Sequence, residues 1–297
     1  MSKPILFTGS GVALVTPMYP DGRINYGKLE ELVDWHVEMG TDALIVCGTT
    51  GEAPTLKMEE HLEAIRVAVA RAAGRIPVIA GTGSNDTDHC INSCREAKRL
   101  GADGLLLVTP YYNKTSQRGL VAHYTTVASA TDLPLILYNV PSRTGLDIKP
   151  ETMAQMYRDI DTVVGLKQAS PDMAATAKLA AISEVPIYSG NDDLTVPVMA
   201  LGGLGVITVL GNVAPAVTRD ICRLWLEGNT DQSRDLFLHW MDLAQGLFTD
   251  VNPVPVKEAM NVMGLEVGGC RLPLYPMEES AKETLVGVLR HHGLLTN

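Results

Sequence analysis

The feature that most constrains the fold is a series of eight short apolar runs rich in β-branched residues. They begin at Gly11, Asp42, Pro77, Gly104, Pro134, Val163, Val185 and Gly205. Their starts lie 20 to 35 residues apart, the length of a strand plus a crossover helix. The runs are almost continuously apolar, which is typical of parallel strands covered on both faces. This spacing predicts a TIM (β/α)8 barrel, with an open, doubly wound sheet as the alternative.

The region after about Glu227 has a different pattern, with no convincing strand. Apolar periodicity predicts helices over about 232–249, 254–264 and 276–292, the second preceded by the proline-rich "VNPVP". We therefore expect an α/β barrel over residues 1–226 and a C-terminal helical domain, an appendage packed on the barrel, over residues 227–297.

Composition and charge narrow the class of protein. With 297 residues, 46% of them hydrophobic, the chain has ample material for a large core. The net charge of -10 disfavours nucleic acid as a partner, because like charges repel. The five cysteines are odd in number and scattered, which favours reduced thiols in the cytoplasm over disulfides or a zinc site. We expect no metal.

Two segments bear on membranes and targeting. The first ten residues hold only a three-residue apolar run, which is too short for a signal peptide. The segment 194–218 contains no charged residue, but Pro197, Pro215 and several glycines interrupt it. It is predicted to be buried α/β core rather than a membrane span, so no membrane partner is expected.

In a barrel of this type, functional groups lie at the C-terminal ends of the strands. Lys167 closes the sixth run, and the alternating positions Val163, Gly165 and Ala169 suggest that it points inward. Burial would lower the pKa of its amine, and a neutral amine can form a Schiff base with a carbonyl compound. The alternative is a strand-end lysine that reaches water.

The turn after the second run, "GTTGE", offers the Thr49 and Thr50 hydroxyls and backbone N–H groups beside glycines. Such a turn can hold a carboxylate. It can also cap the following helix, with Glu52 in the first helical turn. Both roles are compatible, because they use the same free N–H groups.

Three further strand-end groups have a functional and a structural interpretation. Tyr138 ends an apolar run and suits proton transfer; the common structural alternative is a core tyrosine with one satisfied hydroxyl. Arg143, five residues later, could grip a carboxylate or lie on the surface. Tyr111 and Tyr112 occupy a loop, where aromatic residues often anchor the loop or an interface.

Five motifs occur in order along the chain: "GTTGE" at 48–52, "VTPYYNK" at 108–114, "LYNVPSRTG" at 137–145, "GLKQAS" at 165–170 and "NPVPVK" at 252–257. Over residues 7–295 the chain resembles the dihydrodipicolinate synthases, members of the pyruvate-dependent class I aldolase superfamily. The resemblance implies condensation of pyruvate with L-aspartate 4-semialdehyde to 4-hydroxy-tetrahydrodipicolinate, a step of diaminopimelate and lysine biosynthesis. It implies no cofactor, because the Schiff base itself is the electron sink.

The resemblance also implies roles for the catalytic residues. Lys167 matches the lysine that forms the Schiff base, and Tyr138 the tyrosine that moves protons to and from it. Thr49 and Tyr112 match the other members of a hydroxyl relay. The counterpart of Tyr112 reaches into a neighbouring subunit's site, which implies a homo-oligomer, usually a tetramer built as a dimer of dimers.

Four residues match substrate-binding positions. Thr50 corresponds to the threonine that holds the pyruvate carboxylate, and Arg143 to the arginine that receives the carboxylate of the aldehyde substrate. Gly190 and Ile207 correspond to backbone positions lining the pyruvate pocket.

A third set matches the pocket that binds the inhibitor L-lysine in some members of the family. The chain keeps His61, Asn85 and Tyr111, and departs from the pattern with Ala53, Met58 and His89. His89 stands where a glutamate binds the amine of the inhibitor, so we expect weak or absent inhibition by L-lysine.

Two rival functions stay open at this level. One is another pyruvate lyase of the superfamily, such as sialic acid lyase or a 2-keto-3-deoxy sugar acid aldolase. The sialic acid lyase lacks the arginine of "PSRTG", so Arg143 is the discriminating residue. The other is a non-catalytic binding barrel, which the set of Lys167, Tyr138 and Thr49 argues against.

Overall fold

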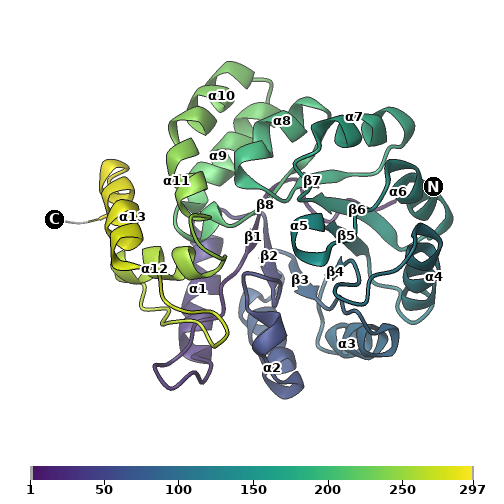
Figure 1. Cartoon of the computed structure of the whole chain (residues 1–297), viewed down its shortest axis with the longest axis horizontal. Helices are drawn as coiled ribbons and strands as arrows, with labels where there is room; N and C mark the ends of the chain where they lie inside the picture. Colours follow the sequence, from purple (N-terminus) through teal and green to yellow (C-terminus); the bar gives the residue numbers. More distant parts are fainter. Residues whose placement is uncertain (1–2, 296–297) are drawn as a thin grey trace.

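The computed structural model describes residues 3–295 and contains a closed barrel of eight parallel strands, surrounded by helices (Figure 1). The strands are β1 (Gly9–Ala13), β2 (Ala43–Val46), β3 (Val78–Gly81), β4 (Gly104–Val108), β5 (Leu135–Asn139), β6 (Val163–Gln168), β7 (Ile187–Ser189) and β8 (Gly205–Thr208). Each predicted run contributes one strand. The doubly wound alternative is excluded, because β1 pairs with β8 and leaves no sheet edge.

The helices of the barrel follow the strands in sequence, and most of them lie outside the ring of strands (Figure 1). They are α1 (Tyr26–Glu38), α2 (Met58–Ala72), α3 (Thr87–Arg99), α4 (Gln117–Ala128), α5 (Pro141–Thr144), α6 (Pro150–Asp159), α7 (Met173–Ile182), α8 (Thr195–Ala200) and α9 (Pro215–Leu226). Short 3-10 helices occupy η1 (Ala53–Thr55), η2 (Asp192–Leu194) and η3 (Leu210–Asn212).

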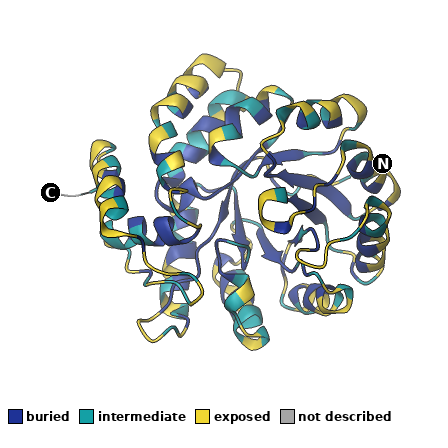
Figure 2. Cartoon of the chain, viewed as in Figure 1, coloured by how far each residue is buried: buried dark blue, intermediate teal, exposed yellow. Residues whose placement is uncertain are grey.

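Alternate strand residues face two separate cores. On β2, Ala43 and Ile45 belong to the cluster inside the barrel, whereas Leu44 and Val46 pack in the layer between strands and helices. Figure 2 shows the strands dark blue and the outer faces of the helices yellow. This arrangement explains why the runs read as continuously apolar: both faces of each strand are buried.

One strand departs from the expected alternation. The pairing of β5 with β6 shifts register between Leu135 and Ile136, so that Leu135 pairs with Val163 and Ile136 with Gly165. As a result Val163 packs in the outer layer and Val164 inside the barrel. The expectation that Val163 shares the inward face of Lys167 was therefore wrong, because a β-bulge breaks the period of two.

The C-terminal region contains α10 (Thr230–His239), α11 (Met241–Gly246), α12 (Val254–Val262) and α13 (Glu279–His291). The helix predicted over 232–249 is thus two helices, interrupted at Trp240. The Trp240 indole stacks on the His292 ring at 4.3 Å, and α11 packs on α13. The break between α10 and α11 coincides with packing against α13. Local periodicity could not reveal this contact, because it lies between distant parts of the sequence.

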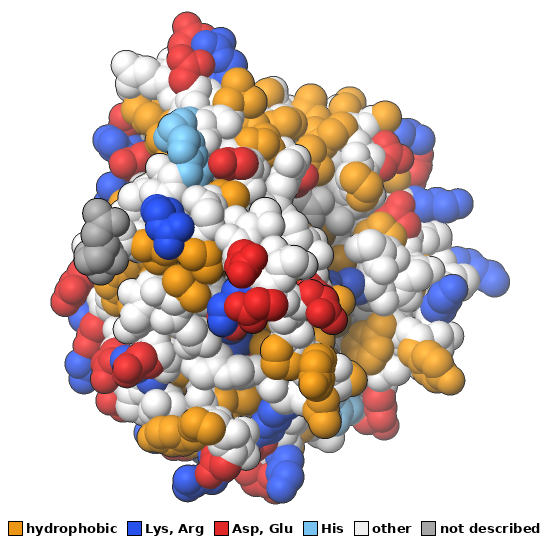
Figure 3. Space-filling view, turned by 60° about the vertical axis from the view of Figure 1, so that its left-hand side comes forward, with side chains coloured by type: hydrophobic (Ala, Val, Ile, Leu, Met, Phe, Trp, Pro, Cys, Tyr) orange, Lys and Arg blue, Asp and Glu red, His pale blue; other side chains and the backbone are white. Residues whose placement is uncertain are grey.

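The surface of this region mixes charges of both signs. Figure 3 shows acidic and basic side chains interspersed around apolar patches on the face that carries the C-terminal helices. Within residues 3–295, every helix is too short or too polar to cross a membrane.

Barrel closure depends on a close approach between Gly9 and Gly205. Gly205 has a φ of +147°, and a Cβ there would lie 1.8 Å from the Gly9 carbonyl oxygen. We expect Gly205→Ala to lower the free energy of unfolding by about 2 kcal/mol or more, because backbone cannot move aside as a flexible side chain can. Gly287→Ala, at an exposed helical site with no atom within 4 Å, should raise it by about 0.5–1 kcal/mol. Urea denaturation measures both, and equal effects would contradict the role of Gly205 in closure.

Candidate active site

The central feature of the barrel mouth is Lys167 on β6. This residue is only 5% exposed to solvent. Its Nζ lies 4.3 Å from the centroid of the Tyr138 ring, on the neighbouring strand β5. Burial lowers the pKa of the amine from 10.5 to about 8, the nearby Asp192 carboxylate opposes this, and the Arg143 charge adds to it. A substantial fraction of the amine is therefore neutral near physiological pH, as nucleophilic attack on a carbonyl requires.

Asp192 is a buried carboxyl group that the sequence analysis passed over. Its oxygens accept hydrogen bonds from the Thr208 hydroxyl and from the N–H groups of Val209 (2.9 Å) and Leu210 (3.0 Å). Burial raises its pKa, while these bonds and the charge of Lys167 act in the opposite direction. Asp192 thus joins the end of β7 to the end of β8 and supplies a counter-charge for Lys167. The available signal was the acidic pair Asp192-Asp193 directly after the seventh apolar run.

Tyr138 and Thr49 line one cavity of about 430 Å³, together with Arg143 from α5. Tyr138 is buried, and burial raises the pKa of its hydroxyl, although the Arg143 charge and the Thr49 side chain oppose this. The hydroxyl therefore keeps its proton at neutral pH. The arrangement places a protonated phenol, whose ring lies against the Lys167 amine, in the same cavity as a guanidinium group.

Thr50 is buried and is not among the residues that line this cavity. Its hydroxyl oxygen accepts a hydrogen bond of 3.0 Å from the amide Nδ2 of Asn252, a buried residue just before α12. The backbone carbonyl of Asn252 in turn accepts a bond of 3.2 Å from Arg143 Nη2. Sequence analysis noted the "NPVPVK" motif but gave Asn252 no role, because its contacts cross more than a hundred residues of chain.

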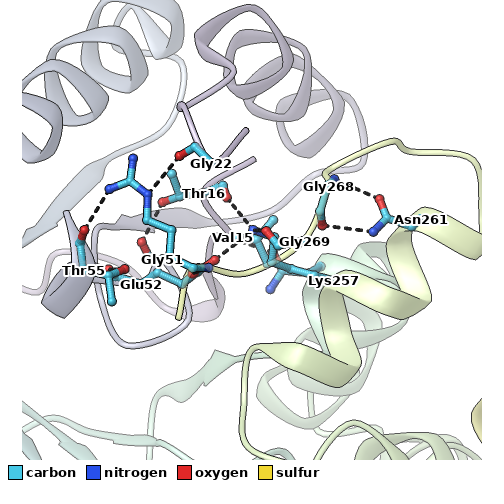
Figure 4. Close-up of polar contacts among 12 residues, drawn as sticks. Val15, Thr16, Gly22, Gly51, Glu52, Thr55, Lys257, Asn261, Gly268 and Gly269 are labelled. Atoms are coloured by element: carbon cyan, nitrogen blue, oxygen red, sulfur yellow. Dashed lines mark hydrogen bonds and ion pairs between the residues drawn. The ribbon is translucent and has the colours of Figure 1, made fainter. Parts of the chain in front are cut away.

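Glu52 forms a buried ion pair with Lys257 of α12, at 2.8 Å (Figure 4). Lys257 also donates to the backbone carbonyls of Thr16 and Gly269, and the second carboxylate oxygen of Glu52 accepts from the Arg271 N–H. Glu52 has a φ of 56° and makes no side-chain cap. Its expected position in the first turn of a helix was therefore wrong: the carboxylate fastens the "GTTGE" turn to the C-terminal region.

Gly190 and Ile207 lie at the last two strands of the barrel: Gly190 directly follows β7, and Ile207 lies on β8. The Gly190 N–H donates to the Gln168 carbonyl at 2.7 Å, and a Cβ at Gly190 would lie 2.6 Å from the Ala169 Cβ. Ile207 is fully buried in the same interior cluster as Tyr138 and Ala169. β7 is the neighbour of β6, whereas β8 lies one strand further along the barrel. The space at Gly190 admits glycine alone.

Tyr112 differs from the other predicted catalytic residues. It is 91% exposed and adopts a positive φ of 66°, a conformation that costs a bulky residue free energy. Within residues 3–295 of this single chain, it does not line the cavity that contains Tyr138 and Thr49.

The predicted inhibitor region lies beside the mouth. Ala53, Met58, His61, His89 and Tyr111 line the same 430 Å³ cavity as Tyr138. Asn85 lies outside it and lines a separate cavity, where its carbonyl accepts a bond from Asn113 Nδ2.

His61 and His89 are the two imidazole groups that line this cavity. The His61 ring nitrogen Nε2 lies 2.9 Å from the Gly81 carbonyl oxygen, and burial lowers the pKa of the ring. The described lining contains no carboxylate, so a cationic ligand would lack an opposite charge in this part of the cavity.

One group of residues in the described chain has the spacing of metal ligands: Asp242, His291 and His292. All three belong to the C-terminal helices, and none is a predicted site residue. The Asp242 carboxylate is already bonded to the His292 ring at 2.7 Å.

The fold and the site together define a (β/α)8-barrel enzyme with a desolvated amine at the barrel mouth. The chain belongs to the dihydrodipicolinate synthetase family, whose model matches residues 6–292.

Individual relatives agree over the whole length of the chain. It is 51% identical over 292 residues to a 4-hydroxy-tetrahydrodipicolinate synthase of Thermoanaerobacter sp. (strain X514), covering 98% of both proteins. The crystal structure of dihydrodipicolinate synthase from Aquifex aeolicus is 44% identical, with a TM-score of 0.94 over 98% of this chain and 100% of that one. The enzyme of Cyanidioschyzon merolae, solved with lysine bound, is 38% identical, with a TM-score of 0.96 over 98% and 100%.

Reductive trapping tests the amine. Borohydride added with pyruvate should give a covalent adduct on the wild-type chain and none on Lys167→Ala, as measured by mass spectrometry. Since Lys167 has a pKa of about 8 and only its neutral form attacks, the rate of trapping should rise as pH passes upward through about 8. An adduct that persists in Lys167→Ala would place the nucleophile elsewhere.

Proposed function

We propose that this chain condenses pyruvate with L-aspartate 4-semialdehyde to give 4-hydroxy-tetrahydrodipicolinate. The observation that carries the proposal is the buried amine of Lys167, with its pKa of about 8, against the Tyr138 ring. Neighbours with the same activity in their names, at about half identity over the whole chain, support the choice of substrates.

The proposed reaction starts when the neutral Lys167 amine attacks the keto carbon of pyruvate. Loss of water from the carbinolamine leaves an iminium ion, which acidifies the adjacent methyl group. Removal of a methyl proton gives an enamine, whose carbon attacks the aldehyde carbon of the second substrate. The amino group of that substrate then attacks the iminium carbon, closes the ring and releases the lysine amine.

Proton transfers accompany these steps, and Tyr138 is the proposed donor and acceptor. Its hydroxyl remains protonated at neutral pH because burial raises its pKa. Thr49 lines the same cavity and is the proposed next member of a relay. Such acid–base catalysis contributes typically about 10²–10⁴-fold to the rate.

Tyr112 is proposed to complete the relay across a subunit interface, in a homotetramer built as a dimer of dimers. Its almost complete exposure and positive φ support this, since a strained, exposed aromatic side chain suits a contact with another subunit.

Four positions are proposed to bind the two substrates. Thr50, Gly190 and Ile207 would hold pyruvate, and Arg143 the carboxylate of the aldehyde substrate. Arg143 lines the cavity that contains Tyr138, and its guanidinium offers a bidentate fork that suits a carboxylate.

The organisation of the chain is part of the proposal. We assign the barrel to residues up to 226 and the helical appendage to those from 227, because α9 ends at Leu226 and no strand of the described residues follows it. Residues 1–2 and 296–297 of these two predicted regions lie outside the described structure. A cytoplasmic location fits the five cysteines, which are all unpaired thiols.

Steady-state kinetics test the activity and separate it from the rival lyases. The wild-type chain should condense pyruvate with aspartate semialdehyde and leave sialic acid uncleaved. Arg143→Ala should raise the KM for the aldehyde about ten- to hundred-fold, because a charge-assisted contact contributes about 1.5–3 kcal/mol. The KM for pyruvate should change much less. Sialic acid cleavage by the wild type, or equal losses for both substrates, would overturn the assignment.

Feedback by L-lysine should be weak or absent. The inhibitor region has His89 where a glutamate would bind an ammonium group, and its cavity lining lacks a carboxylate within the described residues. Loss of that charge-assisted bond costs about 1.5–3 kcal/mol, a weakening of about ten- to hundred-fold.

A titration of activity with L-lysine at subsaturating pyruvate measures this effect. Little inhibition is expected below millimolar lysine, and His89→Glu should restore it. Strong inhibition of the wild type at sub-millimolar lysine would contradict the expectation.

A further inference from the structure

The C-terminal region, residues 227–297, contacts the candidate active site through Asn252. This residue precedes α12, is buried, and lies between two groups that the proposed function assigns to carboxylates. Its side-chain Nδ2 donates to the Thr50 hydroxyl oxygen at 3.0 Å, and its backbone carbonyl accepts from Arg143 Nη2 at 3.2 Å. One residue of the C-terminal region therefore contacts both proposed carboxylate-binding side chains.

The direction of the bond to Thr50 matters. A threonine hydroxyl has one proton to donate and lone pairs that accept. Because the Thr50 oxygen accepts the Asn252 amide proton, the Thr50 proton is free to be donated to another acceptor. A hydroxyl held in this way is a preorganised donor for a carboxylate.

The position of Asn252 is set by a second contact between the same two segments. Glu52, two residues after Thr50, pairs with Lys257, five residues after Asn252. The "GTTGE" turn and the start of α12 are thus joined twice, once by the ion pair and once by the Asn252–Thr50 bond (Figure 4 draws the ion-pair region). Two bonds between the segments fix the distance and the orientation of the hydroxyl.

The other amide atom points to function rather than stability. Asn252 Oδ1 is buried and has no hydrogen-bond partner among the described residues. A buried polar atom without a partner destabilises the fold, and such atoms in native proteins need an explanation. An asparagine at this position therefore costs stability through its unpaired Oδ1, while its Nδ2 supplies the hydrogen bond to Thr50.

We propose that Asn252 is a positioning residue for pyruvate, acting through Thr50, so that the C-terminal appendage completes the pyruvate site. The inference rests on the proposed function, since it takes Thr50 to be the group that binds the pyruvate carboxylate.

The first test is the pyruvate dependence of the borohydride-trapped adduct, together with the KM for each substrate. Asn252→Ala should raise the apparent dissociation constant and KM for pyruvate about ten-fold. This is the effect of losing one charge-assisted hydrogen bond, the one from the Thr50 hydroxyl to the pyruvate carboxylate. The KM for the aldehyde should change little, because the backbone carbonyl that binds Arg143 remains. Equal changes for both substrates, or none, would overturn the role.

Asn252→Asp separates positioning from structural support. Aspartate has nearly the same shape, but its carboxylate can only accept hydrogen bonds. It would accept the hydrogen bond of the Thr50 hydroxyl, which could then no longer donate to pyruvate, and its negative charge would repel the pyruvate carboxylate. We expect it to weaken pyruvate binding more than alanine does. A purely structural role predicts the reverse order.

A double-mutant cycle with Thr50→Val tests whether Asn252 acts through Thr50. If it does, Asn252→Ala should add less than two-fold to the effect of Thr50→Val, because the hydroxyl that it orients is already gone. Effects that multiply to about a hundred-fold would mean that the two residues act independently, and would overturn the proposal.

Asn261→Ala is the matched control. Asn261 is an asparagine within α12, nine residues after Asn252. Its amide donates to the Gly268 carbonyl and accepts from the Gly268 N–H, both at 3.0 Å, and it makes no hydrogen bond to Thr50 or Arg143 among the described residues. It should lower the melting temperature and leave both KM values unchanged. A wild-type chain that forms no pyruvate adduct would refute the proposed function; a wild-type adduct with unaltered Asn252 variants would refute only this inference.

Discussion

The active site depends on the buried ion pair between Glu52 and Lys257. Both residues are almost wholly removed from water, so each charge needs its partner and further hydrogen bonds to offset the loss of hydration. The Thr16 and Gly269 carbonyls and the Arg271 N–H provide those bonds. Breaking a buried pair of this kind typically costs about 3–5 kcal/mol, whereas exposed pairs contribute little. The pair joins the turn after β2 to the C-terminal helices, and thereby makes the appendage part of the barrel mouth.

The chemistry at the mouth follows from barrel closure. Closing the sheet brings the ends of β5, β6, β7 and β8 to one side of the molecule, where Tyr138, Lys167 and Asp192 meet. Burial there disfavours the charged amine, and Asp192 and Arg143 act on it in opposite directions. The balance places its pKa at about 8, so that both the protonated and the neutral, nucleophilic form of the amine are populated near neutral pH.

Much of the fold could be predicted because its signals are local. Each strand needs a run of apolar residues at a spacing that leaves room for one helix, and eight such runs favour closure. Where contacts between distant segments decide the outcome, prediction failed. Val163 faces outward because β6 carries a bulge against β5, and the helix expected over 232–249 is interrupted at Trp240, where α11 packs on α13. Glu52 serves an ion pair instead of a helix cap.

The sequence by itself determined the barrel, the residue types at the strand ends, and the family to which the chain is similar. These depend on periodicity and on motifs of a few adjacent residues. Only the tertiary structure decided the protonation of Lys167, because its pKa depends on burial and on charges that the sequence keeps 24 or more residues away. It also decided the partners of Thr50 and Glu52, which come from residues about two hundred positions later. Burial and long-range hydrogen bonds are properties of the packed chain, and no local pattern encodes them.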